Sequence, residues 1–227
     1  MVLSGCATTI GGSARRHESA SVSLLQLLPT ADEVSAAVGN PLDDTGAPKI
    51  GSIDVLPDGI RDSAGASPLD CLGAAAPLMR VVYEGGGVQG AAWQDYARFG
   101  SGLTVSSAEA GVVRFGSPAE ASRMFARFVT QWQSCEATTV TLHTGGGGGL
   151  DLQVSDVRAE GAILSAVILS DGGDGSMFPT ERAVGVKSDC IVDVDVAVTD
   201  PDPARRVTSG RAAEIVRLML AKIGAVR

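Results

Sequence analysis

The segment from Ser117 to Cys135 carries several agreeing helix signals, and it constrains the fold more than any other part of the chain. Ser117 is a preferred N-cap residue, Pro118 suits the first helical position, and Glu120 completes a capping box. Apolar residues then recur at helical spacing, namely Ala121, Met124, Phe125, Phe128, Val129 and Trp132. The pattern predicts an amphipathic helix that packs on another layer of the protein and ends near Cys135.

Strand patterns lie on both sides of this helix. Apolar residues alternate with polar ones, or form short continuous runs between glycine-rich turns, in residues 89–99, 103–115, 139–143, 150–154, 162–169 and 191–198. The run 162–169 is apolar except for Ser165, which is typical of a central strand covered on both faces. In 191–198, valines alternate with Asp193 and Asp195, so we expect one solvated face there.

Three further helices are expected. Thr30 and Glu33 form a capping box that begins a short helix ending at Gly39, a second helix covers Pro68 to Val82, and an amphipathic helix lies near the C-terminus. Residues 40–68 are expected to form a long, loosely structured crossing. The order of elements predicts one domain over residues 24–227, of the α+β class, with a central, mostly antiparallel sheet packed against helices.

Composition restricts the class of partner. Among the 227 residues, 26 Asp and Glu outnumber 18 Lys and Arg, giving a net charge of −8. Such a field repels a phosphate backbone, so the chain is not expected to bind nucleic acid. Hydrophobic residues make up 44% of the chain, enough for a core that needs no metal, and no cofactor is expected.

The N-terminal residues contain a lipidation pattern. Leu3-Ser4-Gly5-Cys6 resembles a bacterial lipobox, in which the cysteine is diacylated, and residues 7–23 have the composition of a flexible tether. We therefore expect residues 1–23 to be a signal-peptide remnant and tether, with Cys6 holding the protein at the outer face of the plasma membrane. A secretory signal needs a longer segment than Met1 to Gly5, so the natural start is expected to lie upstream or to have been trimmed.

The cysteine count is odd once Cys6 is set aside for acylation. Cys71, Cys135 and Cys190 remain, and one bridge with one free thiol is the simplest outcome. A bond between Cys71 and Cys135 would join the second predicted helix to the third.

Several short motifs occur in an order associated with one family. They are Leu27-Leu28-Pro29-Thr30, Asp70-Cys71, Tyr83, Val112-Val113-Arg114-Phe115, Ser117-Pro118-Ala119-Glu120-Ala121 and Trp132-Gln133-Ser134-Cys135. Together they resemble the PknH-like extracellular sensor domain, over about residues 24–225. That domain is found on a mycobacterial serine/threonine kinase and on mycobacterial lipoproteins.

The resemblance implies a single domain with a central sheet, an open ligand cleft and two disulfides. Cys71 and Cys135 match the first disulfide. Cys190 matches the last cysteine of the family, but its partner would fall where this chain has Gly145 to Gly149. The resemblance therefore implies that Cys190 is a free thiol.

No catalytic pattern stands out. The two histidines are His17, in the tether, and His143, on the polar face of a strand, and neither belongs to a Ser-His-Asp arrangement. Cys190 as a nucleophile, and Asp193 with Asp195 as a carboxylate pair or cation site, are weaker interpretations than a buried thiol and a solvated strand face. The loops 171–176 and 145–149 lack the residues of a calcium or phosphate loop. The chain is expected to be neither an enzyme nor a metal-binding protein.

Aromatic and guanidinium groups suited to a polar-ligand cleft gather in the middle of the chain. The candidates for ligand binding are Tyr83, Trp93, Tyr96, Arg98 and Arg114. Trp93 and Tyr96 fall on opposite faces of their strand, so at least one is expected in the core. The leading hypothesis is a lipid-anchored, extracytoplasmic module that binds a small molecule, lipid or glycan in a cleft. The alternative is a structural or interaction lipoprotein of the cell envelope that docks a partner protein or polymer without a small-molecule site.

Overall fold

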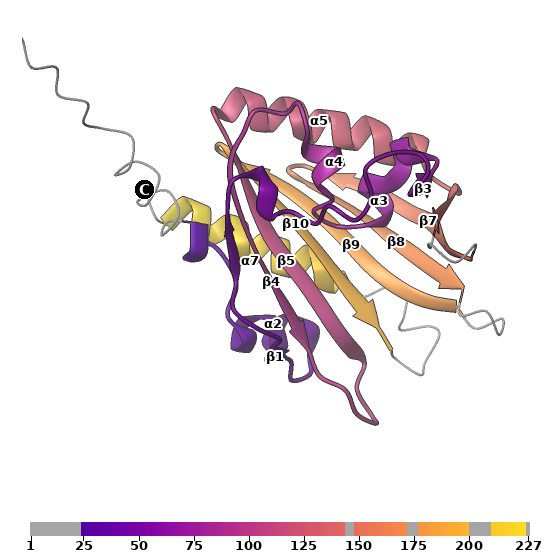
Figure 1. Cartoon of the computed structure of the whole chain (residues 1–227). Coiled ribbons are helices and arrows are strands. Elements are labelled where there is room, and N and C mark those ends of the chain that lie inside the picture. The colour runs from indigo at the N-terminus through magenta and orange to yellow at the C-terminus, as the bar shows by residue number, and fades with distance from the viewer. Residues whose placement is uncertain (1–23, 144–147, 172–176, 200–209, 226–227) are drawn as a thin grey trace, which may run out of the picture.

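The fold consists of one large antiparallel sheet with helices on both faces (Figure 1). The computed structural model describes residues 24–143, 148–171, 177–199 and 210–225. The strands within these residues are β1 (Asp43–Asp44), β2 (Lys49–Gly51), β3 (Ala66–Ser67), β4 (Val88–Ala97), β5 (Val105–Phe115), β6 (Thr139–His143), β7 (Gly149–Glu160), β8 (Ile163–Asp171), β9 (Met177–Lys187) and β10 (Cys190–Val198).

The described strands follow the order β1-β4-β5-β10-β9-β8-β7-β6-β3, and β2 also pairs with β4. Every pairing is antiparallel. The C-terminal strand β10 lies in the middle, between β5 and β9, so residues far apart in sequence become neighbours there. The short strands β1, β2 and β3 pair with the outer strands β4 and β6.

One face of the sheet carries the helix α5 (Pro118–Ser134), the short helices α3 (Leu72–Ala75) and α4 (Arg80–Tyr83), and the 3-10 turns Ile53–Val55 and Leu69–Cys71 (Figure 1). The apolar face of α5 supplies Met124, Phe125, Phe128 and Trp132 to the core beneath it. These side chains meet Val113, Ile191 and Val184 from the three central strands.

The opposite face carries α2 (Ala31–Val38) and α7 (Arg211–Ala225). A second core lies here, in which Ile215, Val216 and Met219 of α7 pack on the valines of β10. Lys222 of α7 joins the two helices, because its Nζ lies 2.6 Å from Glu33 Oε2 and donates to the Leu28 carbonyl. The protein therefore has three layers, with the sheet buried between two helical layers.

Most of the predicted elements are present. The capping box of Thr30 and Glu33 begins α2, and Ser117 accepts a hydrogen bond from the Glu120 N–H at the start of α5. The predicted strand pair around Gly100 to Gly102 is β4 and β5, and the predicted hairpin after α5 is β6 and β7. The fold class, an α+β domain with a mostly antiparallel sheet, is confirmed.

The second helix, predicted from Pro68 to Val82, is wrong as one continuous element. The chain forms a 3-10 turn and α3, becomes extended at Ala76, and resumes helix only at Arg80. Pro77 is the physical reason, because it lacks an N–H and disfavours helical geometry at the residue before it. Leu78 then takes a positive φ of 53°.

Two strand predictions also need correction. β9 was not predicted, because Glu181 and Arg182 interrupt its apolar pattern. β10 was predicted to have one solvated face, yet both of its faces are covered, and Asp193 is only 3% exposed. Residues 40–68, predicted as a loosely structured crossing, contribute the three short strands that cover the sheet edges.

Candidate functional site

A polar network is buried in the core under α3 and α4. Arg182 of β9 and Asp193 of β10 form an ion pair with 2.7 Å between Nη1 and Oδ1. Tyr83 donates its hydroxyl hydrogen to Asp193 Oδ2 at 2.8 Å, and the Leu78 N–H donates to the same oxygen, also at 2.8 Å. Burial, together with the negative charge of Asp193, raises the pKa of Tyr83 well above its usual value, so the phenol stays neutral.

The Arg182 guanidinium also holds the chain around α3. Its nitrogens donate to the carbonyls of Gly73, Ala74 and Ala76, at 3.1–3.3 Å. The guanidinium carbon lies 5.4 Å from the centre of the Trp132 ring of α5. Because β9, β10, α3, α4 and α5 all meet at the Arg182–Asp193 pair, the network fixes the helical layer on the sheet. Its polar groups are occupied by protein partners, so it is a structural core and not an open ligand site.

A row of three carboxylates lies next to this network on the same face. Asp95, Glu109 and Asp195 are direct cross-strand partners on β4, β5 and β10, and Arg182 follows opposite Asp195 on β9. The Glu109 N–H donates to Asp195 Oδ1 at 3.1 Å. Burial, reinforced by the neighbouring carboxylates, raises the pKa of Glu109 to about 9. Burial is also the main cause that raises the pKa of Asp195 to about 6.

A groove of about 340 Å³ lies on the opposite face, between the start of α7 and strands β7 to β9. Three ion pairs lie along it: Arg211 with Glu181 at 2.8 Å, Arg158 with Asp156 at 2.7 Å, and Arg217 with Glu214 at 3.0 Å. Asp156 has a positive φ of 54° at an irregularity in the β7–β8 pairing, which brings its carboxylate to Arg158. The floor includes Ser165 and Ile163 of β8.

Three of the five residues proposed for ligand binding lie in the core. Tyr83 and Trp93 belong to the core under α5, whereas Tyr96 belongs to the core under α7. The Trp93 indole N–H donates to the Val55 carbonyl at 2.7 Å, and Lys49 lies over its ring. Tyr96 donates to the Pro29 carbonyl. Trp93 and Tyr96 thus lie on opposite faces, as expected, and both are buried.

The two arginines of that set lie elsewhere. Arg98 is half exposed near the β4–β5 turn and pairs with Asp43 at 2.8 Å. Arg114 is close to Asp189, with 3.8 Å between Nε and Oδ2, and contacts the Cys190 thiol. The five residues therefore do not line one common cavity in the described part of the chain. The groove at α7 was not foreseen, because it depends on how β7, β8 and α7 meet.

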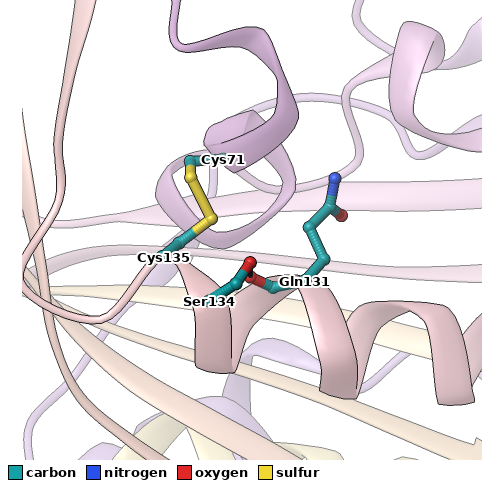
Figure 2. The surroundings of a disulfide bond; sticks show 4 residues. All are labelled: Cys71, Gln131, Ser134 and Cys135. Carbon is teal, nitrogen blue, oxygen red and sulfur yellow. Dashed lines mark hydrogen bonds between the residues drawn. A yellow bond between two sulfur atoms is a disulfide. The ribbon is translucent and has the colours of Figure 1, made fainter.

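The predicted bond between Cys71 and Cys135 is present, and Figure 2 shows it joining the end of α5 to the turn before α3. Beside it, the Ser134 hydroxyl donates to the Gln131 carbonyl at 2.8 Å. Cys190 is a free, buried cysteine, as expected, and burial raises the pKa of its thiol to about 11. Cys6, with the whole segment 1–23, lies outside the described residues.

Within the described residues, the remaining motifs form no catalytic arrangement. His143 is exposed at the end of β6, and His17 lies outside the described residues. The glycine-rich loops 145–149 and 171–176 are described only at Gly148, Gly149 and Asp171. Across the described ranges, no cluster of three or more His, Cys, Asp or Glu side chains is arranged to hold a metal ion, and no helix has the length and apolar character to span a membrane.

Taken together, the three layers, the central C-terminal strand and the disulfide between α5 and the α3 turn define a disulfide-linked α+β domain. The chain belongs to the family of PknH-like extracellular domains, whose sequence model matches residues 19–222. No curated protein sequence matches the chain.

A solved structure has the same fold. The crystal structure of the extracellular domain of PknH from Mycobacterium tuberculosis superposes with a TM-score of 0.75 at 20% identity, covering 90% of this chain and 96% of that one. This likeness shows the fold. A protein of unassigned function from Mycobacterium smegmatis matches with a TM-score of 0.41 and 14% identity, over 86% and 94% of the two chains, which is too remote to carry an argument. The family is one of extracellular domains, in keeping with an extracytoplasmic location.

Proposed function

We propose that this chain is a lipid-anchored, extracytoplasmic binding module without catalytic activity, which holds a polar small molecule or glycan in the groove at α7. Membership of a family of extracellular domains supports the location. The Leu3-Ser4-Gly5-Cys6 motif supports the anchor. The Cys190 thiol supports the absence of catalysis, because a cysteine nucleophile must be an accessible thiolate. Cys190 is buried, and its raised pKa keeps the thiol protonated at neutral pH.

The groove is the observation that carries the ligand proposal. Its volume of about 340 Å³ falls at the lower end of the range typical of small-molecule sites. Arg158, Arg211 and Arg217 each have a carboxylate partner along the groove, so a strongly anionic ligand would have to displace a carboxylate. Paired guanidinium and carboxylate groups instead present donors and acceptors side by side, which suits the hydroxyl groups of a sugar or another polar molecule. The many charged side chains of the groove leave little apolar surface for an acyl chain.

The ligand proposal is tested by native mass spectrometry of the protein after exposure to extracts of the cell envelope. An aqueous extract supplies glycans and an organic extract supplies lipids. We expect the unmodified protein to retain a bound species from the aqueous extract. Ser165→Tyr places a large side chain in the groove and should abolish this binding. Ser107→Tyr, on β5 and outside the groove, should leave the binding unchanged. No bound species with the unmodified protein would contradict ligand binding.

The anchor proposal is tested separately. Intact-mass analysis of the protein from its native host should give the mass of a diacylglyceryl-modified Cys6, and Cys6→Ser should abolish membrane association. A mass that corresponds to an unmodified N-terminal methionine would contradict the anchor.

One observation favours the alternative, a lipoprotein that docks a partner through its surface. Of the four exposed large hydrophobic residues in the described chain, Phe99, Leu150 and Phe178 lie at the same end of the sheet. Phe99 is 86% exposed beyond the end of β4. If docking is the function, Phe99→Ser combined with Phe178→Ser should abolish capture of an envelope protein or polymer, whereas Ser165→Tyr should leave the capture unchanged.

A further inference from the structure

The carboxylate row on the α5 side of the sheet consists of Asp95, Glu109 and Asp195. These residues lie directly opposite one another on three neighbouring antiparallel strands, where side chains on one face are about 5 Å apart. Like charges in such positions repel, and burial strengthens the repulsion because water screens it less. A row of three ionised carboxylates would therefore be strongly unfavourable in this position.

The surrounding groups provide little compensation. The cation that faces the row is Arg182 of β9, and it is already paired with Asp193 at 2.7 Å. Lys49 of β2 lies over the Trp93 ring, 3.8 Å from its centre. From the covering segment, the Leu78 N–H and the Tyr83 hydroxyl both go to Asp193, which adds a fourth carboxylate beside the row.

The central position of Glu109 indicates how the repulsion is relieved. Glu109 lies directly opposite both Asp95 and Asp195, and its N–H donates to Asp195 Oδ1 at 3.1 Å. A proton on the Glu109 carboxyl removes the charge that lies between the two aspartates. Glu109 Oε1 is buried and makes no hydrogen bond within the described part of the chain. Burying such an oxygen costs less free energy when the carboxyl is neutral than when it is charged.

We propose that the row Asp95–Glu109–Asp195 is a proton-binding site that holds one proton at neutral pH and takes up a second on mild acidification. The charge of this part of the sheet face then changes with external pH, and so does the stability of the domain. This inference is independent of the proposed ligand groove, which lies on the opposite face of the sheet.

The pKa values of Glu109 and Asp195 are both raised, and they define the pH range over which the site releases its protons. Burial and the neighbouring carboxylates raise the pKa of Glu109 to about 9, and burial raises that of Asp195 to about 6. In the unfolded chain both groups titrate near pH 4. A group whose pKa is raised by folding binds its proton more tightly in the folded state, and this binding stabilises the fold fully below pH 4. As the pH rises, the contribution of Asp195 is lost by about pH 6 and that of Glu109 by about pH 9.

The site is tested by carbon-13 NMR of the side-chain carboxyl groups of the full chain between pH 4 and 9.5. We expect one glutamate carboxyl to titrate near pH 9 and one aspartate carboxyl near pH 6. Glu109→Gln should remove the alkaline titration, and because the uncharged amide matches the protonated carboxyl in size the variant should fold. Asp95→Asn removes one neighbouring charge and should lower the pKa of Glu109, which provides a second variant.

Unfolding by urea over the same pH range gives an independent readout. The unmodified protein should lose stability between pH 6 and 9, and Glu109→Gln should flatten this loss. Glu160→Gln, an exposed glutamate at the end of β7, is the matched control and should keep the slope of the unmodified protein. The proposal is overturned if all carboxyl groups titrate below pH 5, or if Glu109→Gln and Glu160→Gln show the same slope.

Discussion

Arg182 and Asp193 form an ion pair whose two side chains are almost completely excluded from water, at 0% and 4% exposure. They come from adjacent strands and are offset by two residues, because the direct partner of Arg182 on β10 is Asp195. A buried pair of this kind is maintained by the complete set of hydrogen bonds around it, here from Leu78, Tyr83 and the α3 carbonyls. It joins the helical layer to the sheet.

Asp193→Asn should therefore be strongly destabilising. The substitution leaves the Arg182 charge buried without its partner, and removing one member of a buried pair costs about 3–5 kcal/mol. Urea unfolding at pH 7 should show a loss of this size. Asp43→Asn breaks the exposed pair with Arg98 and serves as the control, with an expected loss of about 1 kcal/mol or less. Equal losses in the two variants would contradict the assigned role.

The disulfide between Cys71 and Cys135 closes a loop of 64 residues. On the chain-entropy model such a bond stabilises the folded state by about 4 kcal/mol. Adding dithiothreitol should lower the free energy of unfolding of the unmodified protein by about this amount and have no effect on the Cys71→Ser, Cys135→Ser double variant. A reductant effect of the same size in the double variant would show that the bond is not its cause.

The Cys190 thiol should be unreactive in the folded protein. Burial raises its pKa to about 11, so very little thiolate is present at pH 7.5, and the side chain is only 1% exposed. In the Cys6→Ser chain, a disulfide-exchange reagent should label no thiol under native conditions and one thiol after denaturation without reductant. Rapid labelling of the native protein would mean that Cys190 is accessible.

Local patterns predicted most of the fold, because they depend on residues close in sequence. Pro118 and Glu120 begin α5 by contacts within one helical turn, and the alternation of β4 and β5 follows from the period of a strand. The same local logic predicts the break at Pro77, which the apolar composition of residues 68–82 obscured. The disulfide came from a family resemblance.

The candidate sites could not be predicted in this way. Asp193 was interpreted as a solvated residue because alternating Val and Asp is typical of a strand with one wet face. Its burial depends on Arg182 and on Leu78, which is 115 positions away. Ligand sites often contain aromatic side chains such as Trp93, Tyr96 and Tyr83. The polar atom of each of these three, however, donates a hydrogen bond to another group of the protein. Only the long-range pairing of strands reveals the carboxylate row and the groove.

Gly111 provides a last test of how the helical layer meets the sheet. A Cβ at this position would lie 2.5 Å from Leu78 Cδ1 and 3.0 Å from Trp93 Cβ. Leu78 cannot easily move away, because its N–H is held by Asp193 and its side chain is fully buried. Gly111→Ala should therefore cost about 1–3 kcal/mol by overpacking, measured by urea unfolding.

The matched control for Gly111→Ala is Gly46→Ala, where nothing lies within 4 Å of the added Cβ and the loss should be small. The clash also predicts coupling between the two positions. Leu78→Ala leaves a cavity that the new methyl group can partly occupy, so the double variant should lose less stability than the sum of the two single variants. Strictly additive losses would show that Leu78 and Gly111 do not contact each other in solution, and that the segment between α3 and α4 lies further from the sheet.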